Sequence, residues 1–181
     1  MKTRFEIPLS QKITPETPFD DAFNITRRNH VMFMISGLVY VLVAWLIQQF
    51  VWGGQPTGFL NLPELTYLML AGAAVVLTLA AIAALFLILP KMTSPAAVLD
   101  KKDISTVETL GFELSQAHMV RIVAAQTPAI LGLVLYLLNG NIPHMIIFVA
   151  ISLLLLLATF PRRDDWEEGK RLFERQKAMR G

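Results

Sequence analysis

The chain has 181 residues, of which 54% are hydrophobic, with 16 Lys and Arg against 14 Asp and Glu and no cysteine. Its mean hydropathy of +0.52 is too high for a soluble domain of this size, whose surface must be polar. The lack of cysteine excludes disulfides and cysteine-ligated metal sites, and basic residues that flank apolar segments argue against nucleic acid as a partner.

Four apolar segments divide the chain into three parts. We expect an all-α integral membrane four-helix bundle with a short cytoplasmic N-terminal arm and a C-terminal surface helix. The predicted parts are an arm at 1–29, a transmembrane domain at 30–161 with spans at about 31–51, 65–89, 117–138 and 144–160, and a charged helix at 162–181. The first span is too long for the core of a signal peptide, so it is expected to be retained.

Prolines mark several of the expected boundaries. Pro15 and Pro18 favour extended backbone over most of the arm, and Pro90 is expected to end the second span before a polar connection at 91–102. Spans three and four, joined by a very short turn that contains Gly140, are expected to form an antiparallel hairpin.

The third span is expected to be part of one long helix over about 103–139, which begins polar and becomes apolar. This helix begins near Ser105 or Thr106, because Ser105 and Glu108 have the spacing of a capping box.

The charged C-terminal helix is expected to lie on the membrane surface. Glu167 and Arg171 have the i, i+4 spacing of an ion pair, and Trp166 and Phe173 can face the membrane.

The basic residues predict the orientation. Five Lys and Arg precede the first span, four lie between Lys91 and Arg121, seven follow Phe160, and the two remaining loops have none. The positive-inside rule therefore predicts a bacterial-type inner membrane protein with both termini in the cytoplasm.

Three polar residues in the third span are candidate functional residues. Counting back about 30 Å from Asn139 at 1.5 Å per residue places Arg121 near the inner interface, where it snorkels or partners a carboxylate or an anionic lipid. Gln126 and Thr127 are deeper, beside Pro128. They either bond across a helix interface and to backbone freed by the proline, or line a site for a solute or ion.

His30 and His118 are expected at similar depths, near the ends of spans one and three. Paired haem ligation is an alternative to two unliganded interfacial histidines. No carboxylate falls within a predicted span, which argues against a metal site of intramembrane acids. We therefore expect no metal and no cofactor.

Small residues in the second and third spans predict close helix packing. Ala80 and Ala84 lie on one side of the second span and are expected to face another helix. The packing candidates are Gly72, Ala80, Ala84, Pro128 and Gly132.

The segment that comprises spans two and three resembles a known family. The alanine-rich second span, the polar connection and the run Val123-Ala-Ala-Gln-Thr-Pro-Ala-Ile-Leu-Gly-Leu-Val-Leu-Tyr136 resemble the rotor-ring c subunits of ATP synthases, and four-span bacterial membrane proteins of similar texture. The resemblance covers about 65–138. Gln126 stands near the position of the family's ion-binding carboxylate and carries no proton at physiological pH, so the resemblance implies packing and not ion transport.

These features predict a non-enzymatic accessory, assembly or scaffolding subunit of an inner-membrane complex, associated with lipid and with other subunits or copies of itself. The alternative is a small oligomeric transporter or channel with a polar pathway near Gln126. A membrane enzyme is the third possibility, for which the sequence offers no nucleophile motif.

Overall fold

The structure is a computed structural model that describes residues 13–55, 57–60, 62–101 and 104–180. Within these ranges the chain is helical and has no strand. Its helices are α1 (Phe19–Phe50), α2 (Glu64–Ala83), the π-helical turn η1 (Ala84–Ile88), α3 (Leu89–Thr93), α4 (Pro95–Lys101), α5 (Val107–Asn139), α6 (Ile142–Ala158) and α7 (Arg163–Arg180). The all-α prediction is therefore confirmed for the described residues.

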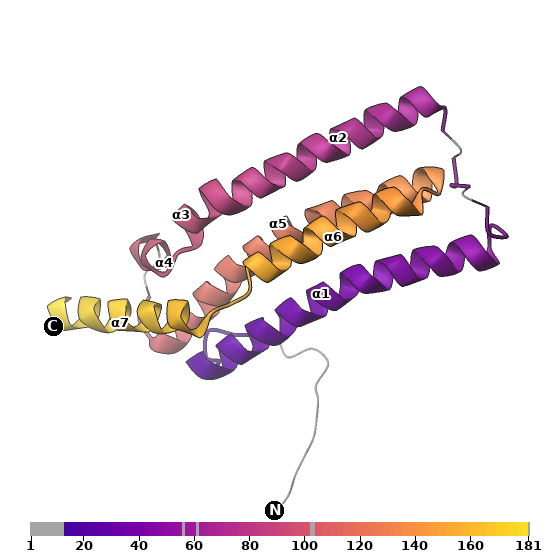
Figure 1. Cartoon of the computed structure of the whole chain (residues 1–181). Coiled ribbons are helices and arrows are strands. Elements are labelled where there is room, and N and C mark those ends of the chain that lie inside the picture. The colour runs from indigo at the N-terminus through magenta and orange to yellow at the C-terminus, as the bar shows by residue number, and fades with distance from the viewer. Residues whose placement is uncertain (1–12, 56, 61, 102–103, 181) are drawn as a thin grey trace, which may run out of the picture.

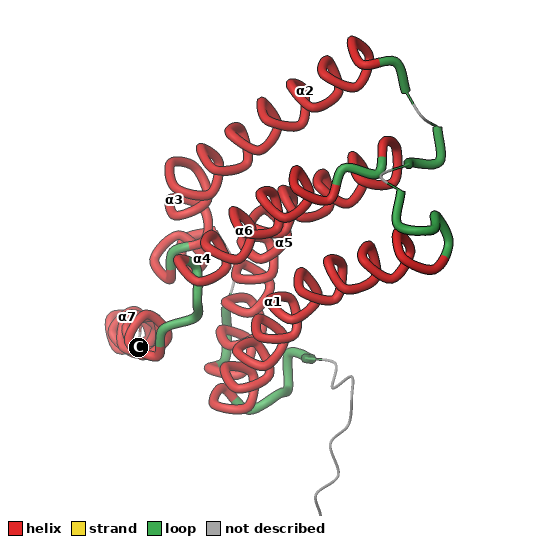
Figure 2. The backbone as a smooth tube through the Cα atoms, turned by 45° about the vertical axis from the view of Figure 1, so that its right-hand side comes forward, coloured by secondary structure: helices red, strands yellow, loops and turns green. Residues whose placement is uncertain are grey.

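The hairpin of α5 and α6 forms the centre of the molecule. Figures 1 and 2 both show α2 on one side of this hairpin and α1 on the other. Helix α5 contacts α1, α2 and α6, whereas α2 packs mainly against α5. Below, the end of the molecule that holds α4, α7 and the start of α1 is called the α7 end, and the other is called the loop end (Figure 1).

Three helical stretches are long and apolar enough to cross a membrane. They are Phe19–Phe50, Glu64–Thr93 and Val107–Asn139. Helix α6 has 17 residues. It is long and apolar enough to cross a membrane only when it is counted together with α7, and a bend of 44° separates the two helices. The described residues thus provide three such stretches, or up to four if the bent pair counts as one.

Helix α1 begins at Phe19 and not near residue 31. Asp20 and Asp21 in its first turn suit the positive end of a helix. Ala22, Thr26 and His30 recur every fourth residue and are buried against the rest of the protein. The expectation of a mostly extended arm is therefore wrong from Phe19 onward, because this buried stripe makes the segment an amphipathic helix. Residues 1–12 of the arm lie outside the described residues.

The second apolar stretch passes Pro90 instead of ending there. The N–H of Leu89 bonds to the carbonyl of Ala84, five residues back, which forms the wider turn η1. Because Pro90 lacks an N–H and its ring crowds the preceding turn, a π-helical turn accommodates it better than a regular one. The helix then continues as α3 to Thr93. The prediction that Pro90 ends the span is wrong for this reason.

Helix α5 is continuous across Pro128, as predicted for one long helix. Thr106 caps its start, because the Thr106 hydroxyl accepts a hydrogen bond from the N–H of Thr109 at 3.1 Å. Gly140 ends it in the left-handed conformation, with φ +71°.

At the loop end, the segment after α1 pairs with the end of α5. The N–H of Phe59 donates to the carbonyl of Leu137 at 2.8 Å. Backbone carbonyls in the last turn of a helix have no partner inside it, so this bond satisfies one of them. A side chain on Gly58 would lie 2.3 Å from the backbone of Asn139, so this approach requires glycine.

An apolar cluster at the α7 end joins α1, α4, α5 and α7. Its buried members are Ala22, Phe23, Val98, Leu99, Leu110, Leu114, Trp166 and Phe173. The ring of Trp166 meets those of Phe19 and Phe23 edge-on, at centroid distances of 5.5 and 5.3 Å. The expectation that Trp166 and Phe173 face the membrane surface is wrong, because helices α1, α4 and α5 supply an apolar surface inside the protein.

An exposed ion-pair network links α7 to α1. Arg163 contacts Asp20 at 2.6 Å and Glu167 at 3.1 Å. Glu167 thus pairs within α7 with the residue four positions before it, and the described residues show no ion pair between Glu167 and Arg171. The pairs are solvent-exposed, so they contribute little to stability.

Candidate functional site

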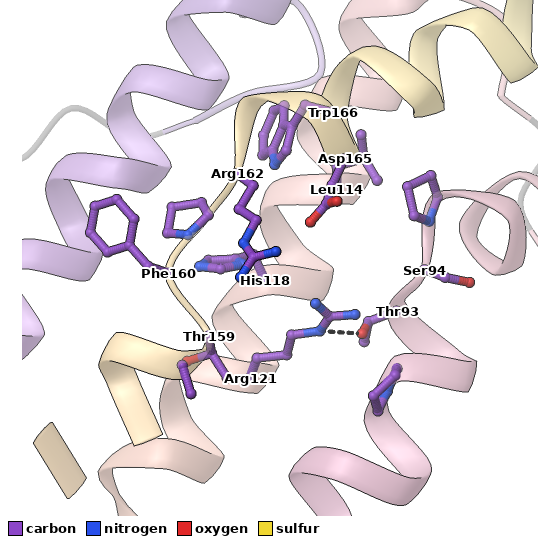
Figure 3. Close-up of a pocket in the computed structure, with 14 residues that line it drawn as sticks. Thr93, Ser94, Leu114, His118, Arg121, Thr159, Phe160, Arg162, Asp165 and Trp166 are labelled. Atoms are coloured by element: carbon purple, nitrogen blue, oxygen red, sulfur yellow. Dashed lines mark hydrogen bonds between the residues drawn. The ribbon is translucent and has the colours of Figure 1, made fainter. Parts of the chain in front are cut away.

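A cavity of about 400 Å³ lies at the α7 end, between α3 on one side and the junction of α6 and α7 on the other, with α5 as its floor (Figure 3). Its polar lining comes from all of these elements. The polar residues are Thr93, Ser94, His118, Arg121, Thr159, Arg162 and Asp165. This concentration of polar groups is the candidate functional site of the protein.

Arg121 reaches into this cavity from α5. Its Nε atom donates to the hydroxyl of Thr93 at 2.6 Å (Figure 3), and that hydroxyl donates onward to the carbonyl of Leu89 at 2.6 Å. The Thr93 oxygen therefore acts as an acceptor that fixes the guanidinium. No described acidic residue lies within ion-pair distance of Arg121, so its terminal N–H groups are available for a ligand.

His30 and His118 form a hydrogen-bonded pair, as their similar predicted depth permits. Nδ1 of His30 lies 3.0 Å from Nε2 of His118, and Nε2 of His30 lies 2.8 Å from the carbonyl of Leu156. Because a carbonyl only accepts, His30 donates through Nε2. A neutral His30 then accepts at Nδ1 from the N–H of His118. The Leu156 carbonyl thereby sets the proton positions of both rings, and His118 carries this pair to the wall of the cavity.

This geometry differs from paired haem ligation. Iron would have to lie between the two nitrogens that instead share a hydrogen bond. Both ring nitrogens of His30 are engaged in hydrogen bonds, and its ring packs edge-on with that of Phe160. Among the described residues, no group of three or more His, Cys, Asp or Glu is placed to hold a metal ion.

Gln126 ties three helices together in the middle of the bundle. It is 3% exposed, and its Nε2 donates to the hydroxyl of Ser36 on α1 at 3.1 Å. Ser152 on α6 donates to the carbonyl of Ala125 at 2.8 Å and approaches Oε1 of Gln126 at 3.3 Å. The amide therefore has a partner at each end, which is the arrangement expected of a structural polar contact between membrane helices.

Thr127 and Pro128 stand apart from this network. The hydroxyl of Thr127 donates to the carbonyl of Val123 in its own helix at 3.1 Å, and Pro128 is fully buried. Because Pro128 has no N–H, the carbonyl of Ala124 lacks its usual partner within the helix. The hydroxyl of Ser152 bonds instead to the carbonyl of the following residue, Ala125. Neither residue lines the cavity at the α7 end.

The small residues fall into two groups. Gly132 lies in the α5–α6 contact, where an added Cβ would be 2.6 Å from that of Phe148. Ala84 is half-buried, whereas Gly72 and Ala80 are exposed on α2. A Cβ on Gly72 would meet nothing within 4 Å. Within the single chain, Gly72 and Ala80 thus have no helix opposite them.

Sequence reasoning missed most of the cavity. The sequence alone places Arg162 and Asp165 in the charged tail, and Thr93 in a polar connection. The periodicity within each segment does not indicate that these residues converge, because the convergence depends on how the start of α7 packs against α1, α4 and α5. Arg121 was the one detectable signal, since an arginine at the edge of an apolar run needs a polar partner.

Comparison of the chain with family models, with curated proteins and with solved structures found no match.

Proposed function

We propose that the protein is a non-enzymatic accessory, assembly or scaffolding subunit of a membrane complex, which associates with other subunits or with further copies of itself. The observation that supports this most is the outer face of α2. Gly72, Ala73, Ala80 and Ala83 are exposed there, on the side of the helix opposite buried Tyr67, Ala74, Thr78 and Leu85. Small residues in lipid allow the backbone of a second helix to approach closely.

The packing of α2 supports the same proposal. Only 17% of the apolar window of this helix is buried, against 44% for α5. A spanning helix that contacts mainly one neighbour leaves most of its surface for lipid or for another protein. Because lipid supplies no hydrophobic drive for helix association, close packing of small residues is a main source of affinity at such a surface.

We further propose a bacterial-type inner membrane location with both termini in the cytoplasm. The start of α1, α3, α4 and α7 lie together at the α7 end, and these elements carry most of the basic residues of the described chain. Basic residues gather on the cytoplasmic side of membrane proteins. The loop end, which has no basic residue, would then face away from the cytoplasm.

The transporter alternative gains no support from Gln126. Its amide is buried and bonded to α1 and α6, so a solute pathway there would have to break a satisfied network.

The substitution Ala80→Leu tests the proposal. Because Ala80 is exposed in the single chain, Leu should leave the thermal unfolding temperature unchanged and obstruct a partner helix. The matched control is Val75→Leu, at an exposed position about 140° around the same helix. We expect sedimentation in mild detergent to show that Ala80→Leu has lost a bound partner or copy that wild type and Val75→Leu retain. If all three proteins sediment alike, the face of α2 is not the interface.

A further inference from the structure

The cavity at the α7 end has the charge and the chemistry of an anion site. Its lining includes two arginines, Arg121 and Arg162, and one carboxylate, Asp165. No ion pair within 4.0 Å joins Asp165 to either arginine among the described residues. Two arginines and one carboxylate give the lining one excess positive charge, which matches a ligand with one negative charge.

The fixed guanidinium of Arg121 suits a tetrahedral oxyanion. Its Nε is held by Thr93, so the terminal nitrogens project with little freedom left to lose on binding. Such a fork donates two parallel hydrogen bonds to phosphate oxygens, and these bonds are among the stronger ones in proteins. Ser94 and Thr159 place further hydroxyl groups around the same space.

The position of the cavity selects the source of the anion. Counting along α5 from Asn139 places Arg121 about 27 Å from the loop end, close to one surface of a bilayer core. Chain neighbours of the lining residues are strongly exposed and apolar, with Met92 at 51% and Leu157 at 57%. A ligand in the cavity would thus contact the polar lining residues with its charged group and lie beside the exposed apolar side chains of Met92 and Leu157.

We propose that this cavity binds the phosphodiester headgroup of an anionic membrane lipid, with Arg121 and Arg162 on the phosphate. Basic pockets between helices on the cytoplasmic side are where such headgroups bind. Asp165 lies on the same lining and lowers the positive potential there. Trp166, whose ring packs on Phe19 and Phe23, forms part of the apolar wall of the cavity (Figure 3).

The test uses the full chain in detergent and native mass spectrometry. The probes are phosphatidylglycerol, phosphatidylcholine with the same acyl chains, and inorganic phosphate. Wild type should retain phosphatidylglycerol in preference to phosphatidylcholine. Equal retention of the two lipids would overturn the proposal, because both carry the phosphodiester and they differ in net charge. Binding of inorganic phosphate without phosphatidylglycerol would overturn the lipid assignment.

Substitutions locate the site. Arg162 is exposed and makes no hydrogen bond or ion pair with the other described residues, so Arg162→Gln should leave folding intact and weaken binding of phosphatidylglycerol about tenfold. Arg121→Lys keeps the charge but loses the fork, so it should also weaken binding. Asp165→Asn should strengthen binding, which no merely structural role predicts. The control is Arg171→Gln, which removes the same charge from an exposed position on α7 outside the lining. Equal weakening by Arg162→Gln and Arg171→Gln would show general surface attraction and overturn the site.

Discussion

At the scale of single residues, the long apolar helices satisfy almost all the buried polar side chains among the described residues. Ser36, Gln126 and Ser152 bond to one another and to backbone, and Tyr136 donates to the carbonyl of Ala44 at 2.5 Å. Full pairing of buried polar groups is expected in an apolar environment without water, because each unpaired group there costs free energy. One described side-chain atom departs from the pattern, the hydroxyl oxygen of Thr78, which is buried without a partner.

We expect Thr78→Val to be neutral or stabilising. Valine has nearly the same shape and removes the unpaired hydroxyl, whose burial costs about 1–3 kcal/mol. Thermal unfolding in detergent measures the change, and Thr26→Val is the comparison. The hydroxyl of Thr26 bonds to Ala22 and Ser115, so its loss should lower the unfolding temperature. A destabilised Thr78→Val protein would reveal a partner for this hydroxyl.

We expect Gln126→Leu to give a folded protein. Ser36 keeps its bond to the carbonyl of Phe33, and Ser152 keeps its bond to that of Ala125, so the substitution leaves neither hydroxyl unpaired. The loss should be about 0.6–1.7 kcal/mol, the size of hydrogen-bond couplings measured between membrane helices. Denaturant unfolding and association with partners are the measurements. A folded variant that has lost a solute flux in liposomes would favour the transporter instead.

At the scale of helices, two glycines inside the long apolar helices should respond oppositely to alanine. In Gly132→Ala the new Cβ would overlap Phe148, so we expect a loss of about 1–3 kcal/mol from overpacking of α5 against α6. In Gly72→Ala the new Cβ meets open space, so the higher helix propensity of alanine should stabilise the protein by up to about 1 kcal/mol. Unfolding of the monomer in detergent measures both. Equal effects would mean that propensity, and not packing, decides both sites.

The same scale separates what the sequence predicted from what it did not. Local signals placed the hairpin and the end of α5 at Gly140, because apolar runs and glycine caps are properties of short segments. The predicted helix boundaries were wrong at two places. The helix continues past Pro90 through a π-helical turn, and helix α1 begins at Phe19, in a polar segment that has a buried stripe. The two failures differ in cause. At Phe19 the deciding contacts come from helices far away in the sequence, which local periodicity does not record. At Pro90 the helix accommodates the proline through a local change of its hydrogen-bond pattern.

At the scale of the whole molecule, the same limit applies to the candidate site. Arg121, His30 and His118 were found one at a time from their depth in predicted spans. Their partners Thr93 and Leu156 were not found, because the sequence does not show which hydroxyl or which backbone carbonyl lies beside a given side chain. The cavity exists because α3, α5 and the α6–α7 junction meet at one end, which is a property of the assembled bundle.

The arrangement of the ends predicts a topology that labelling can test. A cysteine at Ala178 should react with an impermeant maleimide only after the cells are opened, and one at Gln55 should react in intact cells. The reason is that α7 and the loop after α1 lie at opposite ends of the molecule (Figure 1). The chain has no native cysteine, so each signal has a single source. Labelling of Ala178→Cys from outside intact cells would contradict the proposed orientation.

The π-helical turn has a consequence for how the chain tolerates insertions and deletions. A turn of this kind is an α-helix that has accepted one extra residue, and each residue rotates the helix by about 100°. Deleting one residue from Ala84–Ile88 would therefore turn α3 by roughly that angle relative to α2. Thr93 would leave the side that meets Arg121, although no side chain of the pair had been altered. The number of residues in this segment, more than the identity of any one of them, sets the wall of the cavity.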